Sequence, residues 1–161
     1  MTTGMIIIGA VFLIGVVFIA YRLLSKKKKL KEIEELENNF TDIERQVINI
    51  CNSELQINPI VPVIVIRTPT QKFPTKNGYT WFEYEEKVIG LKAHAFTDRK
   101  TIYIKRFDRE TFKEESLEKF VKLYIHESNH VEGMNHGREM SAEDSKEIKK
   151  ILDILNDKNI I

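Results

Sequence analysis

His126-Glu127-Ser128-Asn129-His130-Val131-Glu132-Gly133-Met134-Asn135-His136 is the stretch of sequence that decides the fold. Two histidines four residues apart lie on one face of a helix, so His126 and His130 can both reach one metal ion. Gly133 can adopt the positive φ that ends a helix, and the turn then brings His136 back as a third nitrogen ligand. Three neutral imidazoles leave the fourth position of a zinc ion open for a water, and Glu127 projects close enough to serve that water. The spacing therefore predicts one catalytic Zn²⁺, with Glu127 as general base.

The spacing H-E-x-x-H-x-x-G-x-x-H resembles the motif of the metzincins, a clan of zinc endopeptidases. The resemblance implies that His126, His130 and His136 are the zinc ligands and that Glu127 is the catalytic base. Gly90 to Phe96, followed by Thr101 to Ile104, is similar to two neighbouring strands of the matrixin branch, and Met140 to Ile148 is similar to its closing helix. The resemblance covers residues 60 to 155, and it is strongest at the histidine motif.

The matrixin resemblance also implies where substrate binds. An extended peptide would pair with an edge strand made of Ala93, His94, Ala95 and Phe96. In matrixins the histidine of this strand helps to hold a structural zinc ion, but residues 102–107 contain no His or Asp, which favours His94 as a strand residue near the cleft. Met140 is the candidate for the Met-turn beneath the metal. Its distance from His136 is shorter than usual, so the alternative is that Met140 packs beside the following helix.

The remainder of the domain shows capping and periodicity signals. Thr41 with Glu44 forms a capping box for a helix that ends before Pro59, and Ser141 with Asp144 forms another that starts the last helix. Strands are expected over residues 61–67, 79–84, 87–96 and 101–107, and a long helix over 116–132 carries the first two histidines. This order predicts an α+β fold: a small mixed sheet, a zinc helix and a C-terminal helix, as in a minimal metzincin-like domain.

The N-terminal part is apolar from Met5 to Leu24, which is long enough to cross a bilayer core of about 30 Å as a helix. A cleaved signal peptide is the competing reading, but no basic residue precedes the run. Lys26 to Lys29 follow it, which predicts a single-pass membrane protein with its C-terminal domain on the cytoplasmic side. The expected division is a tail (1–4), a transmembrane helix (5–24) in contact with the lipid bilayer, a charged juxtamembrane linker (25–40) and a metallopeptidase domain (41–161).

Composition narrows the function further. The chain carries 25 Lys and Arg against 24 Asp and Glu, so the sequence gives no indication of nucleic-acid binding. Cys51 is the single cysteine, which allows no internal disulfide and suits a reducing compartment. The sequence thus predicts a membrane-anchored zinc endopeptidase that acts on peptides or proteins. The alternatives are a zinc hydrolase of a non-peptide substrate and a non-catalytic, membrane-tethered zinc-binding interaction module.

Overall fold

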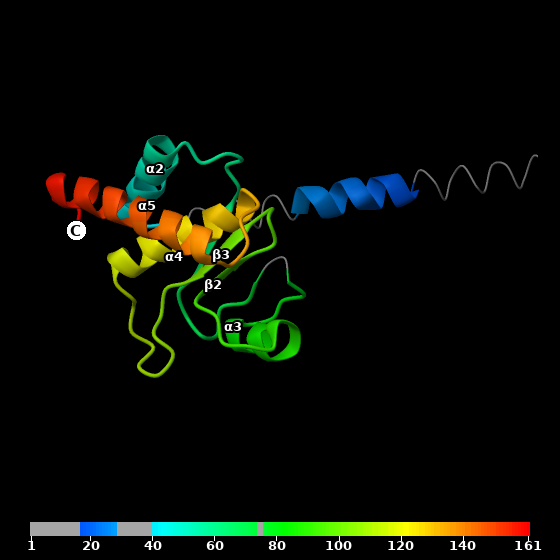
Figure 1. Cartoon of the computed structure of the whole chain (residues 1–161). Coiled ribbons are helices and arrows are strands. Elements are labelled where there is room, and N and C mark those ends of the chain that lie inside the picture. Colours follow the sequence, from blue (N-terminus) through cyan, green and yellow to red (C-terminus); the bar gives the residue numbers. More distant parts are fainter. Residues whose placement is uncertain (1–16, 29–39, 74–75) are drawn as a thin grey trace, which may run out of the picture.

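The computed structural model describes residues 17–28, 40–73 and 76–161, and within them the fold is α+β with a small three-stranded sheet (Figure 1). The elements follow one another as α2 (Asp42–Leu55), β1 (Val63–Ile66), α3 (Trp81–Tyr84), the π-helix η1 (Glu85–Ile89), β2 (Ala95–Thr97), β3 (Ile102–Lys105), α4 (Leu117–Val131) and α5 (Arg138–Asp157).

The sheet has the strand order β1-β3-β2, which places β2 at one edge. The central strand β3 runs parallel to β1, with Val63 opposite Ile102, and antiparallel to β2, with Phe96 opposite Tyr103. Because successive side chains of a strand point to opposite faces, β1 and β3 each contribute to two separate cores.

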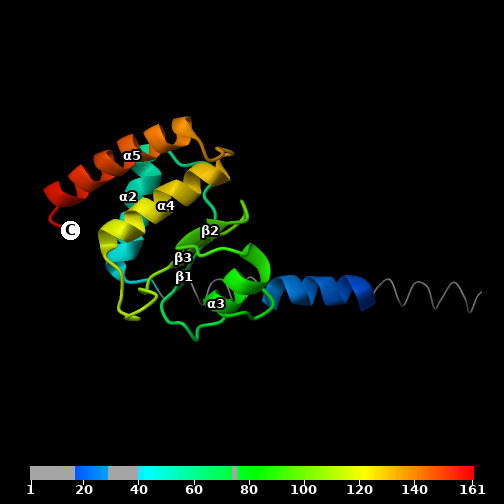
Figure 2. The ribbon, with the colours of Figure 1, turned by 60° about the horizontal axis from the view of Figure 1, so that its bottom comes forward.

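The two faces of the sheet are covered by different elements. Figure 2 shows α2, α4 and α5 gathered on one side of the strands and α3 on the other. The helical side buries Val63, Val65, Ile102 and Ile104 against apolar side chains of the three helices. The opposite side buries a mainly aromatic cluster: Ile64, Ile66, Phe73, Trp81, Tyr103 and Phe107. Burial on both faces explains why β1 is apolar at all four positions.

Helix α2 begins as its capping box predicts. The Thr41 N–H donates to Glu44 Oε2 at 3.0 Å, and the Glu44 N–H donates to Thr41 Oγ1 at 3.2 Å. The Glu44 carboxylate also accepts hydrogen bonds from Arg67 and from Arg106 Nε, the latter at 3.0 Å. Glu44 is buried, so these two guanidinium groups compensate its charge and tie α2 to the ends of β1 and β3.

Two of the strands expected from the sequence are wrong. Residues 79–84 form no strand: Thr80 and Glu83 make a capping box that starts α3 at Trp81, whose side chain is buried. The next stretch continues as η1 up to Ile89. Of the expected strand 87–96, only Ala95 and Phe96 belong to the sheet, as the first two residues of β2. Tyr79, Trp81 and Phe82 are residue types that favour a strand, but the side-chain cap and the burial of Trp81 favour a helical turn.

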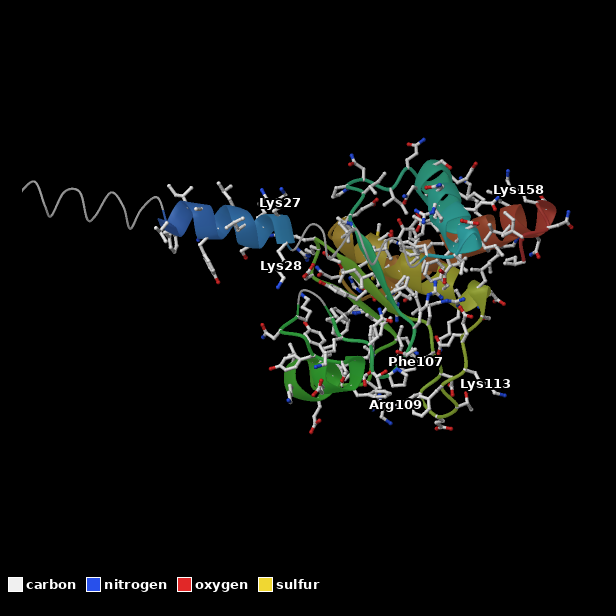
Figure 3. The ribbon with its side chains drawn as sticks, turned by 180° about the vertical axis from the view of Figure 1, so that it is seen from behind. Lys27, Lys28, Phe107, Arg109, Lys113 and Lys158 are labelled. Atoms are coloured by element: carbon white, nitrogen blue, oxygen red, sulfur yellow. The ribbon has the colours of Figure 1, made fainter. Side chains whose placement is uncertain are left out.

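The predicted transmembrane helix over residues 5–24, and with it the single-pass membrane location, is contradicted by the structure. Within the described ranges no helix has both the length and the apolar character needed to cross a membrane. Residues 17–28 are helical, and Figure 3 shows Lys27 and Lys28 near the end of this segment. Residues 5–16 of the expected span and residues 29–39 of the expected linker lie outside the described residues.

Candidate metal centre and cleft

Three histidines meet at the C-terminal end of α4. His126 and His130 lie one turn apart on the helix, and His136 follows the helix end. One ring nitrogen from each histidine lies within 4.8 Å of the other two, and the ring centroids are 4.4 to 5.3 Å apart. The structure thus brings together the three side chains that the sequence predicts as zinc ligands.

The turn that returns His136 to the helix depends on Gly133. This residue has a φ of +104°, a conformation that side chains with a Cβ rarely adopt. The Gly133 N–H donates to the His130 carbonyl at 3.1 Å, and the Met134 N–H donates to the Asn129 carbonyl at 2.9 Å. These two bonds form a Schellman motif, which satisfies the last carbonyls of α4 and reverses the chain. A Cβ at Gly133 would meet nothing within 4 Å, so the backbone conformation alone favours glycine.

Hydrogen bonds fix two of the imidazole rings. His130 Nδ1 lies 2.9 Å from the Met134 carbonyl oxygen, and His126 Nδ1 lies 2.6 Å from Asp144 Oδ2. A carbonyl and a carboxylate only accept, so we assign the proton of each ring to Nδ1. The Nε2 atoms of His126 and His130 then keep their lone pairs, as metal ligands require.

Asn129 connects this arrangement to α5. Its buried amide donates to Asp144 Oδ1 at 2.8 Å and to Glu147 Oε2 at 2.9 Å, so both N–H groups are used. The network therefore runs from the His126 ring through Asp144 to Asn129 and Glu147. Asp144 does not cap its helix as predicted: α5 begins at Arg138 after Gly137, and Ser141 lies inside it.

The donor set fits a zinc ion. Zinc prefers neutral imidazole nitrogens at about 2.0–2.1 Å, so tetrahedral ligand atoms are about 3.4 Å apart, and one ring nitrogen of each histidine already lies within 4.8 Å of the other two. Burial lowers the pKa of His130, which favours the neutral form that binds metals, although its bond to the Met134 carbonyl opposes this shift.

Glu127 lies beside the histidines on α4 and is only 5% exposed. Burial raises the pKa of Glu127 to about 7; the nearby His126 opposes the shift and the Asp144 carboxylate adds to it. A carboxyl group with a pKa near neutrality can both accept and return a proton at physiological pH, as a general base must. The structure thus gives Glu127 the environment expected of that role.

A cleft of about 520 Å³ opens between the histidines and the edge of the sheet. Its wall contains all four residues predicted to bind substrate, and α4 forms the other side. The lining consists of Ile89, Leu91, Lys92, Ala93, His94, Ala95, Phe96, Thr97, Arg99, Leu123, His126, Glu127, His130 and His136.

The start of this wall is held by Glu85, a residue that the sequence did not single out. Its buried carboxylate accepts hydrogen bonds from the Ala93 N–H at 2.9 Å, from Trp81 Nε1 at 2.9 Å and from Arg109. Three donors keep the pKa of Glu85 below its usual range even though burial acts in the opposite direction. Glu85 therefore anchors the cleft wall to the aromatic core.

Two other predicted residues lie apart from the metal centre. His94 lines the cleft with its side chain half exposed, and its Nδ1 lies 3.6 Å from Glu115 Oε1. Within the described part of the chain His94 belongs to no group that could hold a metal ion. Met140 is buried in the first turn of α5, so it lies within a helix rather than in a separate turn.

Comparison with known proteins adds no relative: no protein family, no curated protein and no solved structure matches this chain. The assignment of a function therefore rests on the site itself.

Proposed function

We propose that this chain is a zinc-dependent endopeptidase that hydrolyses peptide bonds with Glu127 as general base. One observation carries the proposal. A buried carboxyl group with a pKa of about 7 lies beside three clustered histidines, at a cleft bounded by the edge of a sheet. A purely structural metal site has no need of such a carboxyl group.

The side chains divide the chemistry between them. His126, His130 and His136 hold the metal, and Asp144 and the Met134 carbonyl keep the first two rings in the tautomer that exposes Nε2. When bound, a zinc ion supplies a Lewis acid that acidifies water and polarises a carbonyl group. The Glu127 carboxylate takes a proton from the attacking water and delivers it to the leaving amine.

The edge strand suits an extended peptide. The His94 carbonyl accepts from the Lys105 N–H at 2.9 Å, and the Asp98 N–H donates to the Thr101 carbonyl at 3.3 Å, so these even-numbered residues face β3. Because neighbouring residues of a strand point their backbone groups in opposite directions, those of Ala95 and Thr97 face the outer edge. A substrate strand can pair with them and lie across the cleft beside Glu127.

The test combines metal analysis with peptide cleavage by the full chain. We expect one zinc per chain and cleavage within a mixed peptide library, read by mass spectrometry. Glu127→Gln should retain zinc and lose cleavage, because the amide cannot accept the proton. Glu118→Gln, on the exposed face of the same helix, is the matched control and should keep both.

Two outcomes contradict the proposal. A zinc-loaded chain that cleaves no peptide of the library would exclude a general endopeptidase and favour a non-peptide substrate or a binding role. Loss of zinc in Glu127→Gln would show that this carboxylate is a ligand rather than a base. His136→Ala separately tests the third ligand and should weaken zinc binding.

A further inference from the structure

We propose that the cleft selects extended peptides in which acidic residues flank an apolar residue. The inference rests on the proposed function and names its substrate class. It follows from three properties of the cleft: the outer edge of β2, apolar lining residues, and unpaired cations at both ends of the edge segment.

Part of the cleft lining is apolar. Ile89, Leu91 and Leu123 line it, and Leu91 is 61% exposed. An apolar substrate side chain placed here removes this surface from water, which is the main source of affinity in such clefts.

Two cations flank the edge segment. Lys92 lies three residues before β2 and Arg99 two residues after it; both line the cleft and both are exposed. Among the described residues neither side chain has an ion-pair or hydrogen-bond partner. The neighbouring Asp98 does not compensate Arg99, because its carboxylate pairs with Lys76 Nζ at 2.5 Å and accepts from the Lys100 N–H.

The acidic residue that lines the cleft and two acidic residues beside it do not cancel this charge. Glu127 is the one acidic residue that lines the described cleft, and it is buried. Glu85 is paired with Arg109, and Glu115 is paired with Lys119 at 2.5 Å. The exposed, unpaired charges of the cleft are therefore positive at both ends, which complements carboxylates on either side of a central apolar residue.

Peptide binding to the full-length Glu127→Gln variant tests the inference without turnover. Two fluorescent peptides share an apolar centre; one has Asp and Glu on both sides, the other has Lys. Fluorescence anisotropy should show the acidic peptide binding about tenfold more tightly at low salt. The ratio should fall as ionic strength rises to about 0.5 M, because exposed charges are screened. The measurement is repeated after zinc removal, where the same preference is expected.

Charge reversal at the cleft supplies the decisive variant. Lys92→Glu/Arg99→Glu should abolish or reverse the preference. The control Lys113→Glu/Lys158→Glu makes the same change of net charge at two exposed lysines outside the cleft (Figure 3). It should leave the ratio within about twofold of the parent.

The possible results separate this inference from the proposed function. Equal binding of the two peptides, binding of neither, or a preference that survives the Lys92 and Arg99 reversal would overturn the inference. A clear acidic preference in a wild-type chain that cuts no peptide would support the inference about binding and refute the endopeptidase proposal. Cleavage that is independent of flanking charge, together with equal binding of the two peptides, would support the endopeptidase proposal and refute the inference about acidic peptides.

Discussion

Replacing Asp144 by asparagine should weaken zinc binding without changing any of the three histidines. Asp144 accepts from His126 Nδ1 through one oxygen and from the Asn129 amide through the other. An asparagine has a single acceptor oxygen. If the oxygen of the new asparagine faces His126, the NH₂ group of the same side chain lies against the NH₂ of Asn129. If the oxygen faces Asn129 instead, the NH₂ group faces His126 Nδ1 and forces that ring into the tautomer with Nε2 protonated.

The structure sets the size of this effect. The His126–Asp144 contact is 2.6 Å long and the Asp144 side chain is only 13% exposed, so solvent does not replace the lost interaction. Partners that orient metal-ligating histidines typically contribute about tenfold to a hundredfold in metal affinity. This range corresponds to about 1.4–2.7 kcal/mol, and we expect the zinc affinity of Asp144→Asn to fall within it.

The assay is a zinc titration in competition with a chromophoric chelator, with circular dichroism of the zinc-free proteins to verify folding. Glu143→Gln is the matched control, since Glu143 is the adjacent residue of α5 and pairs with the exposed Lys146. A folded Asp144→Asn variant with the zinc affinity of the wild type would refute the role assigned to this carboxylate.

Three further predictions concern backbone, thiol and pH. Gly133→Ala should lower the free energy of unfolding by about 1–2 kcal/mol, because φ is +104°, whereas Gly137→Ala, at an extended φ of 172°, should cost less in the same urea titration. Burial raises the pKa of the Cys51 thiol to about 12, so a thiol reagent at about pH 8 should modify Cys51 only after denaturation; rapid labelling of the native chain would contradict this. The folded pKa of Glu127, about 7, lies above its ordinary value of 4.5, so its contribution to stability is fully present below pH 4.5 and is lost as pH rises through 7. Zinc-free wild type should therefore lose about 3 kcal/mol relative to Glu127→Gln across this window, and parallel urea-denaturation profiles would disprove it.

Helices and helix caps that depend on neighbouring residues could be predicted from the sequence. The Thr41 capping box and the long helix over residues 116–132 both occur, the latter as α4 from Leu117 to Val131. The spacing of the three histidines and the turn at Gly133 also follow from helix geometry, so the cluster was predictable from eleven residues.

The role of Asp144 depends on tertiary contacts, which a local sequence pattern does not contain. Ser141 and Asp144 have the spacing of a cap, but the carboxylate of Asp144 lies against His126 and Asn129, which precede it by 18 and 15 residues. No short-range pattern distinguishes these two uses of an aspartate. At Thr80 and Glu83 the opposite holds: the two residues do form a capping box and start α3, although the surrounding aromatic residues favour a strand.

The contacts between α4 and α5 make the orientation of the histidines depend on a helix that follows them in the chain. The ribosome produces the three histidines before it produces most of α5, the helix that holds the His126 ring through Asp144. Before α5 docks on α4, the three histidines lack the carboxylate that orients the first of them. If the centre binds a metal as proposed, its full affinity therefore requires α5 to be docked on α4.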